Sequence, residues 1–440
     1  MLDFGGICKL LCLLLSSSQL VAGISSGEGQ VVLGGSRQTT GSRPPHVVDD
    51  AITAALAKHA DPVHAFVALR PEAAKALAQP RLLHVQGEEK PEWMTEGDKL
   101  RLRRQRKKFV DITDHYKFYA QQADIQAGKA HLPNLTNQPL VRPLLAQISK
   151  QRMYDDLEHL TGYYNRWFGG STGEESANWI HDQIAQIIAE APFHSYISLE
   201  YFTHPFPQPS IIARFEPKVR NWSLPLTIIG AHQDSANYKF PLLPAPGADD
   251  DGSGTVTILE AFRVLAMNGF TPKDGPVEFH WYAGEEGGNL GSNFVARYKK
   301  ESGVRIGAMV EFDMVAYVAK NSTESIVLVK TQADDPLTEW IAGLGEEYTS
   351  LPSLITELDP KAGSDYMSYT KLGYPSAFAT EGDPSAGRFP GDYDPYIHSV
   401  RDTMYVDDET GKFSFDHMAE YCRLAIAFAV EQAGWDNVWR

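Results

Sequence analysis

Cysteine is scarce in this sequence, with only three among 440 residues. Cys8 and Cys12 lie in an apolar run at the N-terminus, and Cys422 lies in an apolar segment near the C-terminus. If the N-terminal run is removed as a signal peptide, the remaining chain cannot form an intramolecular disulfide. The scarcity also argues against a structural metal site built from several thiolates. We expect Cys422 to be a small buried hydrophobic residue of a helix.

The sequence also lacks a hydrophobic run long enough to cross a bilayer, which takes about 20 apolar residues in a helix. The apolar run at 7–15 is too short to do so. The small residues at 21–23 follow it, as they do in a secretory signal peptide, although Lys9 is the only base before them. We therefore predict a signal peptide over 1–23, a secreted extracellular protein and no membrane partner.

Basic residues are in deficit, because 40 Lys and Arg face 56 Asp and Glu, for a net charge of −16. This balance argues against nucleic acid and anionic membranes as partners. One basic cluster, 101–108, ends a stretch rich in Ala, Gly and polar residues. A solvated helix face and a nucleic-acid patch are alternatives, but its place after a leader in an acidic chain favours a processing site. The predicted organisation is a propeptide over 24–108, with an approximate boundary, and a mature domain over 109–440.

Short apolar runs alternate with helical patterns within 109–440. Strands are predicted at 226–231, 277–283, 306–312, 325–330 and 376–380. Helices are predicted at 174–190, 255–267, 290–301, 336–348, 364–372 and 415–432. This alternation is typical of an α/β fold whose mixed, mostly parallel sheet is covered by helices on both faces. No repeat or low-complexity linker interrupts the pattern, so we predict a single domain.

Three consecutive aspartates, Asp249, Asp250 and Asp251, form an acidic turn between Gly247 and Gly252. Their carboxylates repel one another, so a tight glycine-flanked turn seldom holds them without a cation. The predicted helix that follows offers its partly positive N-terminal end to anions. The turn is alternatively an ordinary acidic cap on a surface loop, and residues elsewhere have to decide between the two interpretations.

Further polar residues follow the predicted strands at their carboxyl ends, where open α/β sheets keep their ligands. They are His232 and Asp234 after the first strand, Glu285 and Glu286 after the second, Asp313 after the third, and His398 in a later loop. Each residue alone has an ordinary structural interpretation. Their shared position at one sheet edge is what those interpretations do not explain.

Imidazole and carboxylate ligands without thiolate suit zinc or a cobalt-like ion in a catalytic site. Two histidines and at least three carboxylates are enough for two ions that share a bridging carboxylate. Asp234, two residues after His232, is placed to orient its imidazole. Of the adjacent glutamates, one can bind metal while the other takes a proton from water.

These motifs resemble those of the co-catalytic zinc aminopeptidases, the secreted leucine aminopeptidases of bacteria and fungi. The similarity runs from about Leu157 to the C-terminus, and the order of leader, propeptide and catalytic domain fits the fungal branch best. The matching stretches are Ala-His232-Gln-Asp234-Ser, Ala-Pro-Gly-Ala-Asp-Asp250-Asp-Gly-Ser-Gly, Tyr-Ala-Gly-Glu285-Glu286-Gly, Phe-Asp313-Met and Ile-His398-Ser.

The resemblance implies a zinc-exopeptidase fold, two Zn²⁺ ions and a single catalytic domain over 109–440. It assigns His232 and Asp313 to one zinc, Glu286 and His398 to the other, and Asp250 to both as the bridge. It implies that Glu285 is the general base and later the acid that protonates the leaving amine. The implied substrates are peptides with a free N-terminus, preferably a large apolar one such as leucine. We expect the protein to act as a monomer.

The sequence departs from the family where a disulfide loop usually precedes a Ser-Asp-His stretch. Here 359–363 contains no cysteine, and Lys361 stands where the family has a tyrosine thought to polarise the substrate carbonyl. Lys361 is either a cationic substitute or a solvated side chain, so the departure leaves substrate preference and rate open. Three glycosylation sequons are also present, at Asn134, Asn221 and Asn321.

Two other functions fit the same fold. A glutaminyl-cyclase-like acyltransferase with a single zinc would use part of the same ligand set. A metal-free receptor-like module would have lost ligands, whereas this chain lacks none of them. A hydrolase with the full set of residues is therefore the predicted function.

Overall fold

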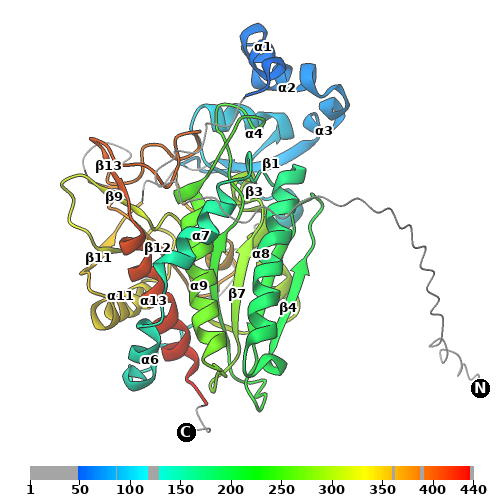
Figure 1. Ribbon diagram of the computed structural model, residues 1–440. Helices are drawn as coiled ribbons and strands as arrows, with labels where there is room; N and C mark the ends of the chain where they lie inside the picture. The colour runs from blue at the N-terminus through cyan, green and yellow to red at the C-terminus, as the bar shows by residue number, and fades with distance from the viewer. Residues whose placement is uncertain (1–47, 86, 117–127, 359–361, 387–390, 437–440) are drawn as a thin grey trace, which may run out of the picture. The chain divides into compact units, whose positions relative to one another are not determined.

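An eight-stranded sheet lies at the centre of the computed structural model, which describes residues 48–436 except 86, 117–127, 359–361 and 387–390 (Figure 1). In spatial order its strands are β11 Ser353–Thr356, β10 Ile326–Val329, β12 Ser376–Thr380, β8 Ile306–Phe312, β6 Leu226–His232, β7 Val277–Tyr282, β5 Ser210–Phe215 and β4 Ile197–Phe202. Four of the neighbouring pairs, among them β8–β6 and β6–β7, are parallel, and the other three are antiparallel. The predicted mixed, mostly parallel sheet is confirmed.

The central strands β6, β7 and β8 are buried along their whole length. Their apolar and β-branched residues alternate between the two faces of the sheet, so each strand contributes to two cores. On β6, for example, Ile229 belongs to the larger core and Ile228 to the smaller one. This double burial fixes the register of the strands and hence the position of their ends.

Helices cover both faces of the sheet, as predicted. The larger core contains side chains of α6 Gln138–Leu145, α7 Lys150–Leu160, α8 Ser171–Glu190, α9 Gly254–Met267, α11 Asp335–Tyr348 and α13 Phe415–Ala433. Figure 1 shows α7, α8 and α9 side by side in front of the sheet. The smaller core receives α10 Leu290–Glu301 and α12 Tyr366–Thr370. Cys422 of α13 is fully buried, as expected.

A small N-terminal part precedes the large sheet. It contains α1 Asp50–Lys58, α2 Pro62–Leu69, η1 Pro71–Ala73, α3 Ala74–Leu77, α4 Glu96–Arg104 and η2 Thr113–His115, with a three-stranded sheet of β2 Glu92–Thr95, β1 Pro80–Val85 and β3 Phe109–Asp111. Thr95 and Asp98 form a capping box that starts α4. From Pro45 onward the chain forms one compact unit.

The basic cluster 101–108 extends from the last turns of α4 to the start of β3. Strand β3 pairs with β1, with Leu83 opposite Asp111. A cut after Lys108 would therefore lie between two strands of one sheet, and the propeptide boundary stays a prediction. The predicted signal peptide lies outside the described residues. No helix among the described residues combines the length and apolarity needed to cross a bilayer.

Three small elements complete the structure. Strands β9 Tyr317–Ala319 and β13 Gly411–Phe413 form a two-stranded sheet. A short turn of helix, η4 His194–Tyr196, leads into β4. Three strands of the large sheet, β4, β5 and β11, were not predicted from the sequence.

Candidate metal centre

The five polar residues predicted at strand ends and His398 of the later loop come together at one edge of the sheet. His232 is the last residue of β6, and Asp313 follows β8 directly. Glu285 and Glu286 begin the turn η6 Glu285–Gly287 after β7. Because β6, β7 and β8 are parallel neighbours, their carboxyl ends meet at the same place.

Asp250 lies between two groups of candidate ligands. Its Oδ1 is 3.1 Å from Nε2 of His232, which in turn is 3.6 Å from Oδ1 of Asp313. Its Oδ2 is 2.8 Å from Nε2 of His398, which lies 3.5 Å from Oε1 of Glu286. Within each group the ligand atoms lie within 4.8 Å of one another. Asp250 thus belongs to two triads of candidate ligands, one with His232 and Asp313 and the other with Glu286 and His398.

Most of these ligand atoms are buried and have no hydrogen-bond partner. The unpartnered atoms are Nε2 of His232 and His398, Oδ1 of Asp313 and both carboxylate oxygens of Glu286. Burying polar atoms in this way is costly unless something compensates them. Two cations with nitrogen and oxygen ligands would do so, and the donor set suits zinc. The residues therefore fit the two metal ions that the sequence predicts.

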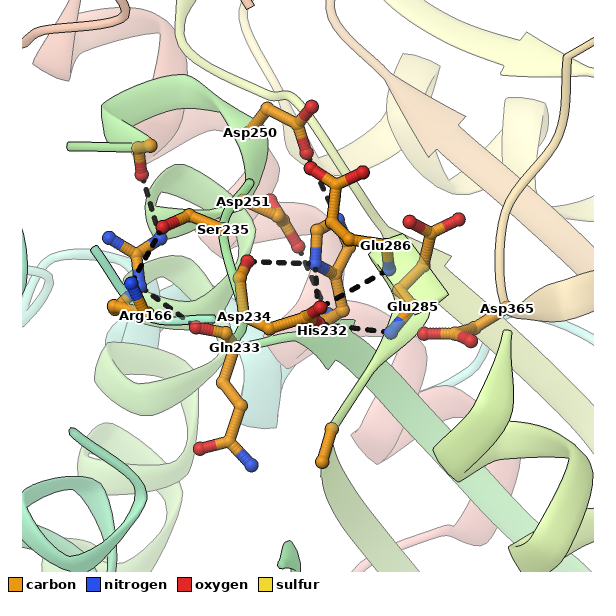
Figure 2. Close-up of polar contacts among 12 residues, drawn as sticks. Arg166, His232, Gln233, Asp234, Ser235, Asp250, Asp251, Glu285, Glu286 and Asp365 are labelled. Carbon is orange, nitrogen blue, oxygen red and sulfur yellow. Dashed lines mark hydrogen bonds and ion pairs between the residues drawn. The ribbon is translucent and has the colours of Figure 1, made fainter. Parts of the chain in front are cut away.

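Asp234 contacts both His232 and the turn that carries Glu285 and Glu286 (Figure 2). Its Oδ1 lies 3.4 Å from Nδ1 of His232, and its backbone oxygen is 3.2 Å from the same nitrogen. Its carboxylate also accepts the backbone N–H groups of Glu285, at 3.0 Å, and Glu286, at 3.2 Å. Asp234 thus contacts both the imidazole of His232 and the glutamate turn, and its orienting role stays a prediction.

The acidic turn Ala248–Ser253 (η5) leads directly into α9, and its Asp250–Asp251 peptide bond is cis. Asp251 supports the turn, because its carboxylate accepts the N–H groups of His232 at 3.1 Å, Gly254 at 2.8 Å and Met314 at 3.2 Å. Only glycine fits at position 254, since the Cβ of any other residue would lie 2.1 Å from the backbone oxygen of Phe312.

Asp249 also supports the turn and accepts the N–H of Ala316 at 3.0 Å. Asp249 and Asp251 thus hold the backbone, and Asp250 alone of the three aspartates faces both histidines.

Two residues missed in the sequence also hold this turn. Asp402 accepts the backbone N–H groups of Asp249, at 2.7 Å, and Asp250, at 3.2 Å. Arg166 is almost fully buried and donates to the backbone oxygens of Gln233, at 2.8 Å, Pro246 and Gly247, at 2.8 Å. No local pattern marks either residue, because each is far along the chain from the atoms it contacts.

Ser364 and Asp365 lie beside Asp313 and Glu285, respectively. Ser364 Oγ donates to Oδ2 of Asp313 at 2.6 Å and so fixes the orientation of that carboxylate. Asp365 is buried beside Glu285 and accepts a hydrogen bond from Ser292. Lys361, whose role the sequence left open, lies outside the described residues.

Burial and crowding shift the pKa values of the carboxyl groups. Burial raises the pKa of Glu285 to about 7 and that of Glu286 to about 8, although the charge of Lys108 acts in the opposite direction. Burial alone would raise the pKa of Asp250, but the charge of His398 and the close approach of both imidazoles hold that pKa well below its ordinary value. The ionised form of Asp250 is therefore favoured at this position.

A cavity of about 420 Å³ opens beside Asp250, Asp313 and His398. Its apolar lining includes Met314, Leu358, Phe378, Tyr393 and Ile397. The cavity is large enough for an apolar side chain whose backbone lies at the ligand triads.

The N-terminal part reaches the same cavity. Arg106 and Lys108 line it, and Nζ of Lys108 lies 3.5 Å from Oε2 of Glu285. Arg103 is buried and donates through Nε, at 2.8 Å, and through Nη2 to the backbone oxygen of Glu286. The basic cluster is therefore in part a contact with the glutamate turn, which sequence reasoning missed.

The three sequon asparagines, Asn134, Asn221 and Asn321, are all exposed. Their side chains are accessible to a glycan, and glycosylation stays a prediction.

Comparisons with known proteins agree with this geometry. Residues 210–423 match the model of peptidase family M28. The chain is 38% identical to leucine aminopeptidase 1 of Chaetomium globosum over 78% of its own length and 83% of that protein. It is 37% identical to leucine aminopeptidase 1 of Fusarium vanettenii, over 79% and 86%.

Among solved structures, the LapA aminopeptidase of Legionella pneumophila superimposes with a TM-score of 0.68 at 27% identity, covering 83% of this chain and 96% of that one. The chain therefore belongs to peptidase family M28 and is a metallo-aminopeptidase of that family.

Proposed function

We propose that the protein removes single N-terminal residues from peptides with the help of two zinc ions bridged by Asp250. His232 and Asp313 would hold one ion, and Glu286 and His398 the other. The observation that carries this proposal is the position of Asp250, whose two oxygens face the two histidines at 3.1 and 2.8 Å. A shared carboxylate between two open triads is the arrangement that a pair of ions requires.

Two zinc ions, when bound, polarise the scissile carbonyl and acidify a water molecule. The protein supplies the proton carrier. We propose that Glu285 accepts the proton of the water at its carboxylate and later gives it to the leaving amine nitrogen. Burial raises its pKa above the ordinary value, which suits both steps, because a base and acid of this kind works best when its pKa is near the operating pH. Its Oε2 is also buried without a hydrogen-bond partner.

The cavity supports a preference for large apolar N-terminal residues. A leucine side chain would contact Met314, Phe378 and Ile397, whereas a charged one would lose its hydration there. The free α-amine of the substrate would lie against the carboxylates of the centre. The names of the curated relatives support leucine as the preferred residue.

We further propose that the protein is secreted after removal of 1–23 and is made as a zymogen. In the uncleaved chain, Lys108 places a positive charge beside Glu285, and Arg106 lines the cavity. Both would obstruct a substrate amine, and Lys108 would also hold Glu285 in an ion pair. Separation of the N-terminal part would then free the base. Glycans on the three exposed sequons and a monomeric state complete the proposal.

The test is a panel of aminoacyl-4-nitroanilides assayed on metal-quantified protein after removal of the N-terminal part. We expect fastest release from leucine, none from N-acetyl-leucine, loss of activity with a chelator and recovery with zinc. Fully loaded protein that releases no N-terminal residue from any substrate would refute the aminopeptidase proposal. Cyclisation of N-terminal glutamine without hydrolysis would instead support the acyltransferase.

A further inference from the structure

The ring of Tyr238 stacks on the imidazole of His398. The two rings are parallel within 1°, and their centroids are 3.6 Å apart. The backbone N–H of Tyr238 also donates to the backbone oxygen of His398, at 3.1 Å. Tyr238 therefore contacts this histidine through both its ring and its backbone.

The backbone of His398 has an uncommon conformation. Its φ of +58° is in the left-handed region, which non-glycine residues rarely adopt without constraint from their surroundings. The other histidine, His232, is held by Asp234 at Nδ1. Among the described residues, no side chain forms a hydrogen bond with Nδ1 of His398. The imidazole of His398 is instead contacted by the stacked ring of Tyr238.

The loop that carries Tyr238 is itself fixed. The buried side chain of Asn237 donates to the backbone oxygen of Pro244 at 2.9 Å and accepts the N–H of Lys239 at 3.0 Å. Tyr238 lies between these two anchored neighbours, and its ring lines the cavity with Asp250 and His398. A side chain presented so rigidly can hold a neighbouring ring in one orientation.

We infer that Tyr238 is a positioning residue for His398. Its ring holds the imidazole so that Nε2 faces Asp250, at 2.8 Å, and Glu286, at 3.5 Å. This inference rests on the proposed two-ion centre and concerns only the ion held by Glu286 and His398. The role belongs to the ring and not to the hydroxyl group, because the stacked contact is between the ring faces.

Three variants of the full chain test the inference. Tyr238→Leu removes the aromatic ring, and Tyr238→Phe keeps it. Tyr201→Leu is the matched control, because Tyr201 stacks on His181 at 4.1 Å and 13° on the outer strand β4. Zinc binding is measured by equilibrium dialysis against buffered free zinc, and the absorption spectrum is followed during titration with Co²⁺.

We expect Tyr238→Leu to lower the affinity for one of the two ions by about 10- to 100-fold, because loss of a residue that orients a metal ligand has an effect of this size. The second ion should bind as in the wild type, and only one of the two Co²⁺ steps should shift. Tyr238→Phe and Tyr201→Leu should bind both ions with wild-type affinity.

Unchanged binding of both ions by Tyr238→Leu would overturn the inference, as would an equal loss of both ions together with a lower melting temperature. An effect of Tyr238→Phe as large as that of Tyr238→Leu would show that the hydroxyl group positions His398 and would refute the role of the ring. A wild-type chain that binds fewer than two ions would refute the proposed two-ion centre. The two failures are therefore distinguishable.

Discussion

The ammonium nitrogen of Lys108 lies 3.5 Å from Oε2 of Glu285, the proposed general base. Burial alone would lower the pKa of Lys108, but the charges of Glu285 and its neighbours keep that pKa well above its ordinary value. The lysine is thus positively charged beside the carboxylate. The amine of an arriving substrate would compete with Lys108 for the carboxylates of the centre.

The first prediction concerns the uncleaved chain. Lys108→Gln should raise kcat/KM for leucine-4-nitroanilide by about tenfold, since a contact of about 1.4 kcal/mol corresponds to that factor. Mass spectrometry must show that the chain is still uncleaved during the assay. Lys107→Gln is the control, because Lys107 is exposed and should leave the activity unchanged. If Lys108→Gln and Lys107→Gln behave alike, Lys108 does not inhibit.

The second prediction separates the two adjacent glutamates. Glu285→Gln should lower kcat by about 10²–10⁴-fold, because a general base contributes rate enhancement of this order, and should leave both metal ions bound. Glu286→Gln should reduce the metal content, because Glu286 is a proposed ligand. Steady-state kinetics and elemental analysis on the same preparations check both. Turnover of Glu285→Gln within a few fold of wild type would show that the proton is taken elsewhere.

The fold was predictable, and the candidate ligand residues could be named from the sequence, because both follow from local patterns. Buried central strands read as apolar runs, and ligands at their carboxyl ends follow from the topology of parallel sheets. Strands β4 and β5 were missed for local reasons too. Strand β4 is partly exposed and therefore has no continuous apolar run, and prolines at 205, 207 and 209 separate it from β5.

The supporting residues could not be found from the sequence. Arg166 contacts a backbone oxygen 81 residues away, and Arg103 contacts one 183 residues away. Neither Tyr238 nor Asp402 belongs to a motif, and their partners become neighbours only in the folded chain. What the sequence reveals is which residues have the chemistry, whereas packing decides which residues hold them in place.

The third prediction concerns Arg166, which holds the loop before the acidic turn. Arg166→Met should lower the free energy of unfolding by about 3–5 kcal/mol, because it removes the side-chain hydrogen bonds to three buried carbonyl oxygens, leaves those of Gln233 and Pro246 unpaired, and removes a buried charge among aspartates. Urea unfolding measures the loss. Arg401→Met should cost little, since 63% of that side chain is exposed. Equal costs for the two variants would contradict the account.

The fourth prediction concerns stability at low pH. Glu278 is buried on β7 and accepts hydrogen bonds from Lys299 at 2.6 and 2.8 Å, His280 at 2.7 Å and Arg214 at 2.9 Å. Burial alone would raise its pKa, but Lys299 and then His280 and Arg214 hold the pKa well below its ordinary value of 4.5. This carboxylate therefore stabilises the fold above about pH 4.5, and the stabilisation is lost as the pH falls below that value.

Glu278→Gln should lower the free energy of unfolding at pH 7 by about 3–5 kcal/mol, because the cations around it lose their partner. It should also flatten the dependence of that free energy on pH between about 5 and 3. Denaturant unfolding across this range is the measurement. Glu301→Gln is the matched control, since Glu301 is half exposed and lies 3.7 Å from Arg297. A pH dependence identical to that of the wild type would rule out Glu278 as its source.

The central claim is that Asp250 bridges two zinc ions, and anomalous X-ray diffraction from zinc-saturated crystals tests it most directly. We predict two peaks about 3.5–4 Å apart on either side of the Asp250 carboxylate. One peak should lie beside His232 and Asp313, and the other beside Glu286 and His398. A single peak at full zinc loading, or two peaks that do not share Asp250, would contradict the account.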